Sequence, residues 1–105
     1  MNSNMQDLLE EIIVMLHSVY DPEIPVNIFD LGLIYDVDID EGNNVRIEMT
    51  LTSPNCPAVD FILSDVQMKV ESVEAVNEVT IDLVFDPPWE RSMMSEEALL
   101  ELGFL

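Results

Sequence analysis

The sequence is poor in cysteine and in basic residues, and each shortage excludes a class of protein. The single cysteine, Cys56, cannot form an internal disulfide or supply the paired cysteines of a structural zinc site. Three basic residues stand against 22 acidic ones, and the resulting formal charge of -19 repels nucleic-acid phosphates and anionic lipid surfaces. We therefore expect neither nucleic acid nor a membrane among the partners.

Long apolar runs and phosphate-binding loops are also missing. No apolar stretch approaches the ~20 residues of a membrane span, and residues 1–4 lack the basic and apolar regions of a signal peptide. No glycine-rich loop ends in a Walker lysine, which argues against an ATPase. We expect a cytoplasmic protein, in which a reducing environment keeps the thiol of Cys56 free.

The composition is that of a folded domain. Hydrophobic residues make up 49% of the 105 residues, well above the share in a disordered acidic tail. A chain of this length forms one core, so residues 1–105 are predicted to be a single domain. The acidic residues then lie on its surface, either only as a solvated, soluble exterior or as an attraction for basic proteins or metal cations, and charge alone does not choose between the two.

Apolar periodicity predicts the fold class. Helical spacing predicts helices over residues 5–19, 57–72 and 95–103. Alternation predicts strands over residues 33–39, 45–51 and 79–85, the first two forming a hairpin. The prediction is an α/β, two-layer small domain of order α-β-β-α-β-α, with the helices packed on one face of a small mixed sheet. The other face of the hairpin is expected to meet solvent, with Asp36, Asp38, Arg46, Glu48 and Thr50.

Three loops are expected to meet at one edge of this sheet. The helix between the second and third strands returns the chain, so both strands end at the edge where the first strand begins. The loops there, residues 21–32, 53–57 and 86–89, hold every proline of the chain. Rigid loops over strand ends are typical of functional sites. The alternative is that these prolines only terminate strands and helices.

Cys56 is the most conspicuous residue of these loops. Its position at the start of a helix favours a thiolate, whereas Asp30 and Asp86, if close, oppose one. The alternative role is that of a small buried side chain. The only histidine, His17, is expected to lie at the border of the core, so no Cys-His dyad and no hydrolase is predicted. One thiolate is too few for an iron-sulfur cluster, so any cluster must be shared with a second subunit or a partner.

Four short motifs follow one another along the chain: Asp21-Pro22-Glu23, residues 27–35, residues 50–57 and Asp86-Pro87-Pro88-Trp89. In this order they resemble the metal-sulfur cluster biosynthetic family of SufT-like and PaaD-like proteins, and the stand-alone SufT-like members fit best. The resemblance covers nearly the whole chain. It implies a small α/β domain that assists iron-sulfur protein maturation as an accessory factor or carrier, without a turnover reaction.

The resemblance also implies a set of site residues. The functional centre comprises Cys56, Asp30, Thr50, Thr52, Asp21 and Glu23. The loop framework comprises Pro57, Asp86, Pro87 and Trp89. The one metal-ligand candidate is Cys56, in a transient or shared role. No stably bound cofactor is expected, only an iron-sulfur cluster or iron in transit.

The expected partners are iron-sulfur assembly scaffold or client proteins, and a homodimer is a further candidate. Some relatives are fused to an Mrp-type P-loop ATPase, so here such an ATPase would act as a separate partner. The cysteine-rich tail of PaaD-like members is missing, which argues against their role in phenylacetate oxygenation. Two other hypotheses stay open: an acidic adaptor that binds proteins without handling metal, Cys56 being structural, and a cysteine-dependent enzyme.

Overall fold

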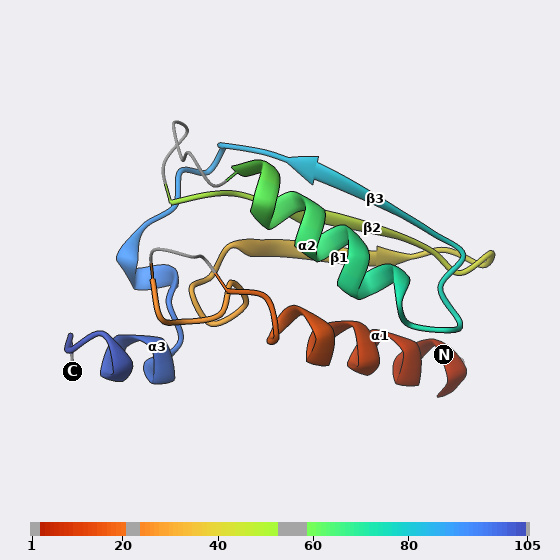
Figure 1. The fold of residues 1–105 in the computed structure, drawn as a ribbon, viewed down its shortest axis with the longest axis horizontal. Coiled ribbons are helices and arrows are strands. Elements are labelled where there is room, and N and C mark those ends of the chain that lie inside the picture. Colours follow the sequence, from red (N-terminus) through yellow and green to blue (C-terminus); the bar gives the residue numbers. More distant parts are fainter. Residues whose placement is uncertain (1–2, 21–23, 53–58, 105) are drawn as a thin grey trace.

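The computed structural model describes residues 3–20, 24–52 and 59–104. They form a layer of helices on a three-stranded sheet, and the predicted order of elements is confirmed (Figure 1). The elements are α1 (Ser3–Leu16), β1 (Ile34–Ile39), β2 (Asn44–Met49), α2 (Val59–Glu71), β3 (Glu78–Leu83), the short 3-10 helix η1 (Arg91–Met93) and α3 (Glu96–Glu101).

The sheet has the strand order β1-β2-β3, which the sequence pattern left open. β1 is antiparallel to β2, and β3 is parallel to β2, with Ile47 paired to Val37 on one side and Ile81 on the other. The hairpin turn places Asn43 at a positive φ of 60°, a conformation that asparagine tolerates. Hydrogen bonds from Asn44 and from the Gly42 amide hold the pKa of the Asp40 carboxyl in this turn below its ordinary value.

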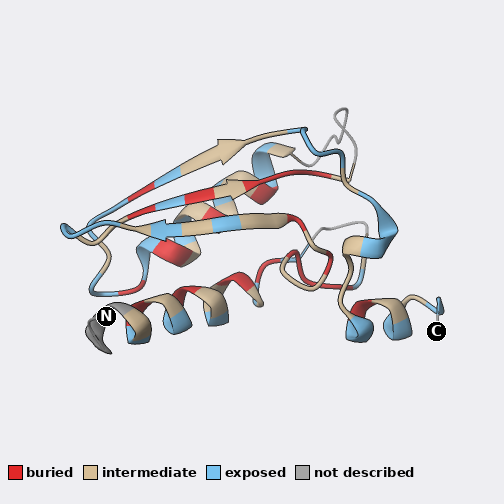
Figure 2. Ribbon diagram, turned by 180° about the vertical axis from the view of Figure 1, so that it is seen from behind, coloured by how far each residue is buried: buried red, intermediate tan, exposed pale blue. Residues whose placement is uncertain are grey.

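The core lies between the sheet and the helices α1 and α2. Each helix contributes buried residues four apart and β2 contributes alternate residues, because these spacings keep side chains on one face. The main contributors are Leu8, Ile12, Leu16, Ile62, Val66, Val70, Val45, Ile47 and Met49. Figure 2 shows this burial along the helix faces turned to the sheet and along β2. Of the described helices, none combines the length and apolar character needed to cross a membrane.

The predicted bounds of the first helix were wrong at its end. The helical stripe continues to Val19, which is fully buried, but α1 ends at Leu16. The amides of Ser18 and Val19 bond three residues back, to Met15 and Leu16, at 3.0 and 3.3 Å. These bonds to the third preceding residue end the α-helix, although the apolar stripe continues. Apolar periodicity alone could therefore not locate the end of the helix.

α3 packs against the loop before β1 and lies beyond the end of the sheet (Figure 1). The Ser95 amide donates to the Asp30 carbonyl at 2.8 Å, and the Ser95 hydroxyl caps the helix by accepting from the Ala98 amide. Ala98 is buried. The predicted serine cap is confirmed, and the cap ties the last helix to the loop that carries Asp30.

The outer face of the sheet is polar, as predicted, except at one position. Asp36, Asp38 and Arg46 are exposed and Glu48 is half-buried. Thr50, however, is only 1% exposed, so the expectation that it faces solvent is wrong. Alternation assigns a side chain to a face of the sheet, but it does not show which part of that face another segment covers.

Candidate functional site

Two of the three predicted loops meet at one edge of the sheet, which we call the loop edge: residues 24–33, 50–52 and 84–95. The Thr50 amide donates to the Leu33 carbonyl at 2.9 Å, and the Trp89 indole donates to the Leu31 carbonyl at 2.7 Å. Trp89 and Leu31 are 58 residues apart in the chain. The start of β1 is therefore fixed to the segments that follow β2 and β3.

The third predicted loop lies outside the described residues. The same holds for four of the predicted site residues: Asp21, Glu23, Cys56 and Pro57. The described chain on either side of residues 53–58 ends at Thr52 and resumes at Val59, the start of α2. The end of β2 and the start of α2 lie at the end of the sheet that carries the loop edge (Figure 1).

Asp30 has a fixed orientation. The Asn27 amide donates to Asp30 Oδ2 at 2.8 Å, and the Asp30 backbone amide donates to Asn27 Oδ1 at 2.9 Å. The Asp30 side chain is 17% exposed and Asn27 is buried. Asparagine and aspartate side chains commonly stabilise turns in this way. The carboxylate keeps its second oxygen, Oδ1, for other contacts.

His17 approaches that second oxygen. Its Nε2 lies 3.8 Å from Asp30 Oδ1, while its Nδ1 lies 2.8 Å from the Ile13 carbonyl and must be protonated to donate to it. The ring stacks on Phe29 with centroids 4.4 Å apart. A separation of 3.8 Å is too long for a hydrogen bond but allows a charge pair when the imidazole is protonated. His17 therefore stands beside the loop edge, within charge-pair distance of Asp30.

Tyr35 joins β1 to the segment after β3. The register passes from Ile34 opposite Met49 to Asp36 opposite Glu48, so Tyr35 is the additional residue of a bulge. Bulges redirect side chains at sheet edges. The phenol donates to the Pro87 carbonyl at 2.7 Å and lies 3.7 Å from the sulfur of Met93. A groove of about 530 Å³ lies here, lined by Gly32, Ile34, Tyr35, Glu48, Pro87 and Met93.

Thr50 is the one described residue whose buried side-chain polar atom has no hydrogen-bond partner there. An unpaired buried hydroxyl lowers stability, so native structures contain few of them. Its amide is used in the bond to Leu33, which fixes the backbone beneath the hydroxyl. Thr52, further along, is half-buried. Because functional sites often keep groups that lower stability, this unpaired hydroxyl makes Thr50 a candidate functional residue.

The predicted framework residues have different environments. Trp89 is partly buried against the core and Pro87 holds the Tyr35 hydroxyl, whereas the side chain of Asp86 is exposed. Within residues 3–20, 24–52 and 59–104, no group of three or more His, Cys, Asp or Glu is placed to hold a metal ion. Asp30 and His17 alone make too small a ligand set for iron or zinc.

Substitution of Trp89 by phenylalanine is expected to lower the free energy of unfolding by about 1–2 kcal/mol, because the Leu31 carbonyl loses its donor. Urea unfolding of the two proteins measures the difference. Tyr35→Phe removes the other tether at an exposed position and should cost less than about 1 kcal/mol. Equal losses in the two variants would contradict this assignment of the stronger tether to Trp89.

Four residues at or beside the loop edge were not predicted as site residues: His17, Asn27, Tyr35 and Gly32. The Asn27-x-x-Asp30 spacing was a readable signal, because a polar residue three positions from an aspartate often closes a turn. A glycine that ends such a loop signals a special backbone conformation, and Gly32 has a φ of +82°. His17 and Tyr35 act through contacts between elements, which carry no local signal.

The fold and the loop edge together define a class: a small α/β domain with a three-stranded mixed sheet, rigid loops at one edge and, in the described chain, no complete metal-ligand set. The model of the family described as "Iron-sulfur cluster assembly protein" matches residues 9–82. The chain belongs to this family, and the resemblance read from the sequence motifs is confirmed.

Two curated relatives match over nearly their whole length. The chain is 61% identical to an Fe-S protein maturation auxiliary factor of Porphyromonas gingivalis, over 100% of both chains. It is 42% identical to the Fe-S protein maturation auxiliary factor YitW of Bacillus subtilis, over 91% of this chain and 94% of the relative. These relatives are named as auxiliary factors, not as enzymes.

Solved structures confirm the fold. A domain of unknown function from Bacillus anthracis superimposes with a TM-score of 0.91 at 40% identity, covering 99% of this chain and 100% of that one. A conserved hypothetical protein from Thermotoga maritima gives a TM-score of 0.79 at 41% identity, covering 90% and 92%. The α-β-β-α-β-α order is thus shared with relatives of known structure.

Proposed function

We propose that this protein is an accessory factor in iron-sulfur protein maturation that assists cluster transfer to client proteins through transient contact at Cys56. The observation that carries the proposal is the full-length, 61% identity to an Fe-S protein maturation auxiliary factor. A transient role also fits the chemistry, because one thiolate provides a quarter of the four ligands that a cluster usually takes. The cluster is cargo, and no resident cofactor is part of the proposal.

The loop edge provides a rigid setting for such contact. The chain that leads to Cys56 leaves β2 at Thr50, which is bonded to Leu33, and Trp89 is bonded to the neighbouring Leu31. Asp30 lies on the same loop edge, where two hydrogen bonds with Asn27 hold its carboxylate in place. Among the described residues these contacts do not close a ligand cage around a metal.

The test of the pathway is a strain that lacks the gene. Activities of iron-sulfur enzymes should fall, activities of cluster-free enzymes should not, and the wild-type gene should restore the former. Measurement of both enzyme groups in one extract separates a maturation defect from a general growth defect. Unchanged iron-sulfur enzyme activities under iron limitation and oxidative stress would contradict the proposal.

The Thr50 hydroxyl should affect stability and function in opposite directions. Thr50→Val replaces an unpaired buried hydroxyl with a methyl group and should raise the free energy of unfolding by up to about 1 kcal/mol. Thr50→Ser keeps the hydroxyl and should cost about 1 kcal/mol through the lost methyl group. We expect the serine variant to restore iron-sulfur enzyme activities better than the valine variant. If the more stable valine variant restored these activities better than the serine variant, Thr50 would not belong to the functional centre.

A second candidate is an acidic adaptor in the same pathway that binds proteins without handling metal, with Cys56 in a structural role. The observation in its favour is the charge of -19 on a chain whose described part lacks a metal-ligand set. Such an adaptor should bind clients in a salt-sensitive way, and Cys56→Ser should leave that binding unchanged. Loss of client binding in the serine variant at constant stability would exclude the adaptor.

The partners in this proposal are scaffold or client proteins of the cytoplasm, and a separate Mrp-type P-loop ATPase is one of them. The chain is 28% identical to part of an iron-sulfur cluster carrier protein of Synechocystis, and it spans 25% of that protein's length. A relative of this domain is therefore joined to a larger carrier in one chain. In this proposal the domain meets the same kind of partner by association.

A further inference from the structure

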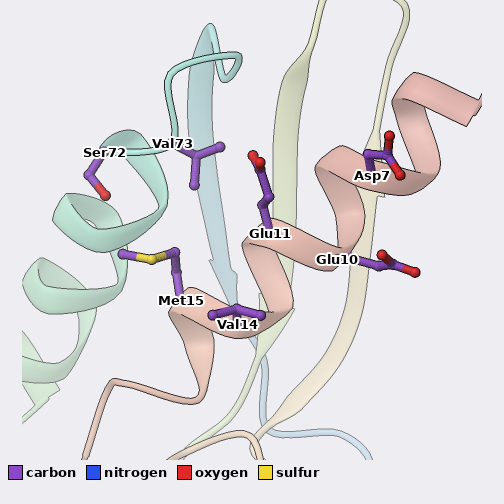
Figure 3. A pocket seen from close by; sticks show the side chains of 7 residues that line it. All are labelled: Asp7, Glu10, Glu11, Val14, Met15, Ser72 and Val73. Carbon is purple, nitrogen blue, oxygen red and sulfur yellow. The ribbon is translucent and has the colours of Figure 1, made fainter.

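A groove lies between α1 and the end of α2, away from the loop edge. It has a volume of about 590 Å³ and is lined by Asp7, Glu10, Glu11, Val14, Met15, Ser72 and Val73. Figure 3 shows these side chains, the carboxylates all coming from α1. α2 ends at the side of the molecule opposite the loop edge (Figure 1), so the groove is separate from the site described above.

The groove combines an apolar strip with an acidic ridge. Val14 is 66% exposed, and Met15 and Val73 lie beside it at the border of the core. Asp7, Glu10 and Glu11 stand three and four positions apart and therefore share one side of α1. Like charges at this spacing destabilise a helix by about 0.2–0.5 kcal/mol per pair. The ridge thus lowers the stability of α1 while no basic residue lines the groove to offset it.

The three basic residues of the chain are all engaged elsewhere. Arg46 pairs with Asp82, Lys69 Nζ donates to the Ser18 carbonyl at 3.1 Å, and the Arg91 guanidinium lies 4.0 Å above the ring of Phe104. A second copy of this chain therefore has no basic segment to place in the groove, and two copies of charge -19 repel each other. The positive charges that match the carboxylates of the groove must therefore come from a different protein.

We propose that this groove binds a basic amphipathic helix of a partner protein. The ridge and Val14 extend from residue 7 to residue 14, a rise of about 10 Å or two helical turns. Lysine or arginine side chains spaced by one turn on a partner helix match the carboxylates, and an apolar side chain between them covers Val14 and Met15. The groove is thus a docking surface that selects a cationic partner independently of Cys56.

The probe is a fluorescent amphipathic peptide of lysine and leucine with its charges at helical spacing, and anisotropy measures its binding at about 0.15 M salt. Glu10→Lys/Glu11→Lys should weaken binding about tenfold, because two attractions become repulsions. The control Glu41→Lys/Glu101→Lys makes the same change of net charge at exposed sites outside the groove and should weaken binding at most about twofold. Val14→Asn removes apolar surface without changing the charge, so it tests the apolar strip and should also weaken binding.

A peptide of the same composition in scrambled order should bind at least about tenfold more weakly, because its leucines no longer share one face. Equal weakening by the two charge-reversed variants, or equal binding of the scrambled peptide, would reduce the effect to general attraction by an acidic surface and overturn the proposal. A homodimer that Val14→Asp dissociates in sedimentation experiments would overturn it as well. The measurement involves neither iron nor Cys56, so its result is independent of the proposed function.

Discussion

Replacement of Gly32 by alanine is expected to lower the free energy of unfolding by about 3–5 kcal/mol, a large share of the stability of a domain this small. Gly32 has a φ of +82°, which an alanine adopts only with strain. A Cβ atom there would also overlap the Met93 carbonyl oxygen and lie 2.8 Å from the Met93 carbonyl carbon. Both contacts are with backbone, which cannot move aside as a flexible side chain can.

Gly103 provides a matched control for this prediction. It has nearly the same φ, +83°, and apart from its two chain neighbours no atom of the described residues lies within 4 Å of the position where its Cβ would stand. Gly103→Ala should therefore cost only the strain of the conformation, about 1 kcal/mol. Urea unfolding of both variants separates strain from overlap. Equal losses of unfolding free energy in the two variants would contradict the close contact between Gly32 and the Met93 carbonyl group.

Replacement of Cys56 by serine is expected to abolish the contribution of the protein to iron-sulfur enzyme activity. In a strain lacking the gene, the serine variant should leave these activities at the level of an empty vector. The reason is chemical: a thiolate binds iron and exchanges clusters, and a serine hydroxyl stays protonated and does not. The activities of two iron-sulfur enzymes, compared with one cluster-free enzyme, measure the effect.

The control for this variant must exclude loss of fold. Thr80→Ser makes a conservative change on the exposed outer face of β3 and should restore activity as the wild type does. Immunoblots and thermal unfolding should show both variants at wild-type abundance and stability. Full restoration by Cys56→Ser would exclude the thiol as the working group and leave the acidic adaptor as the better hypothesis.

The sequence predicted the fold through local periodicity and the rule of strand direction. Because α2 returns the chain, the ends of β2 and β3 had to meet the start of β1, and the bonds from Thr50 to Leu33 and from Trp89 to Leu31 confirm that meeting. The hairpin and the serine cap of α3 could also be predicted, because each depends on residues that are neighbours in the sequence.

What the sequence could not predict depends on contacts between distant elements. The contact of His17 with Asp30 joins the end of α1 to a later loop, and Thr50 is buried although alternation places it on the outer sheet face. The packing of α3 on the Asp30 loop is of the same kind. Alternation and helical spacing describe one element at a time, so they leave such contacts open.

The two proposals concern opposite ends of this small domain. At the loop edge, hydrogen bonds from Trp89, Tyr35 and Ser95 join the segments around the start of β1 to those that follow β3. The proposed docking groove lies between α1 and the end of α2, and acidic side chains line it. A partner held at the groove leaves the loop edge free for a client, which suits a factor that brings two proteins together.

The central claim is that Cys56 assists cluster transfer, and anaerobic transfer kinetics test it most directly. A cluster-loaded scaffold and an apo client are mixed with no addition, with wild-type protein or with Cys56→Ser, and the appearance of client activity is followed over time. We predict that the wild-type protein accelerates transfer and that the serine variant gives the rate seen with no addition. Equal acceleration by the two proteins would contradict the account.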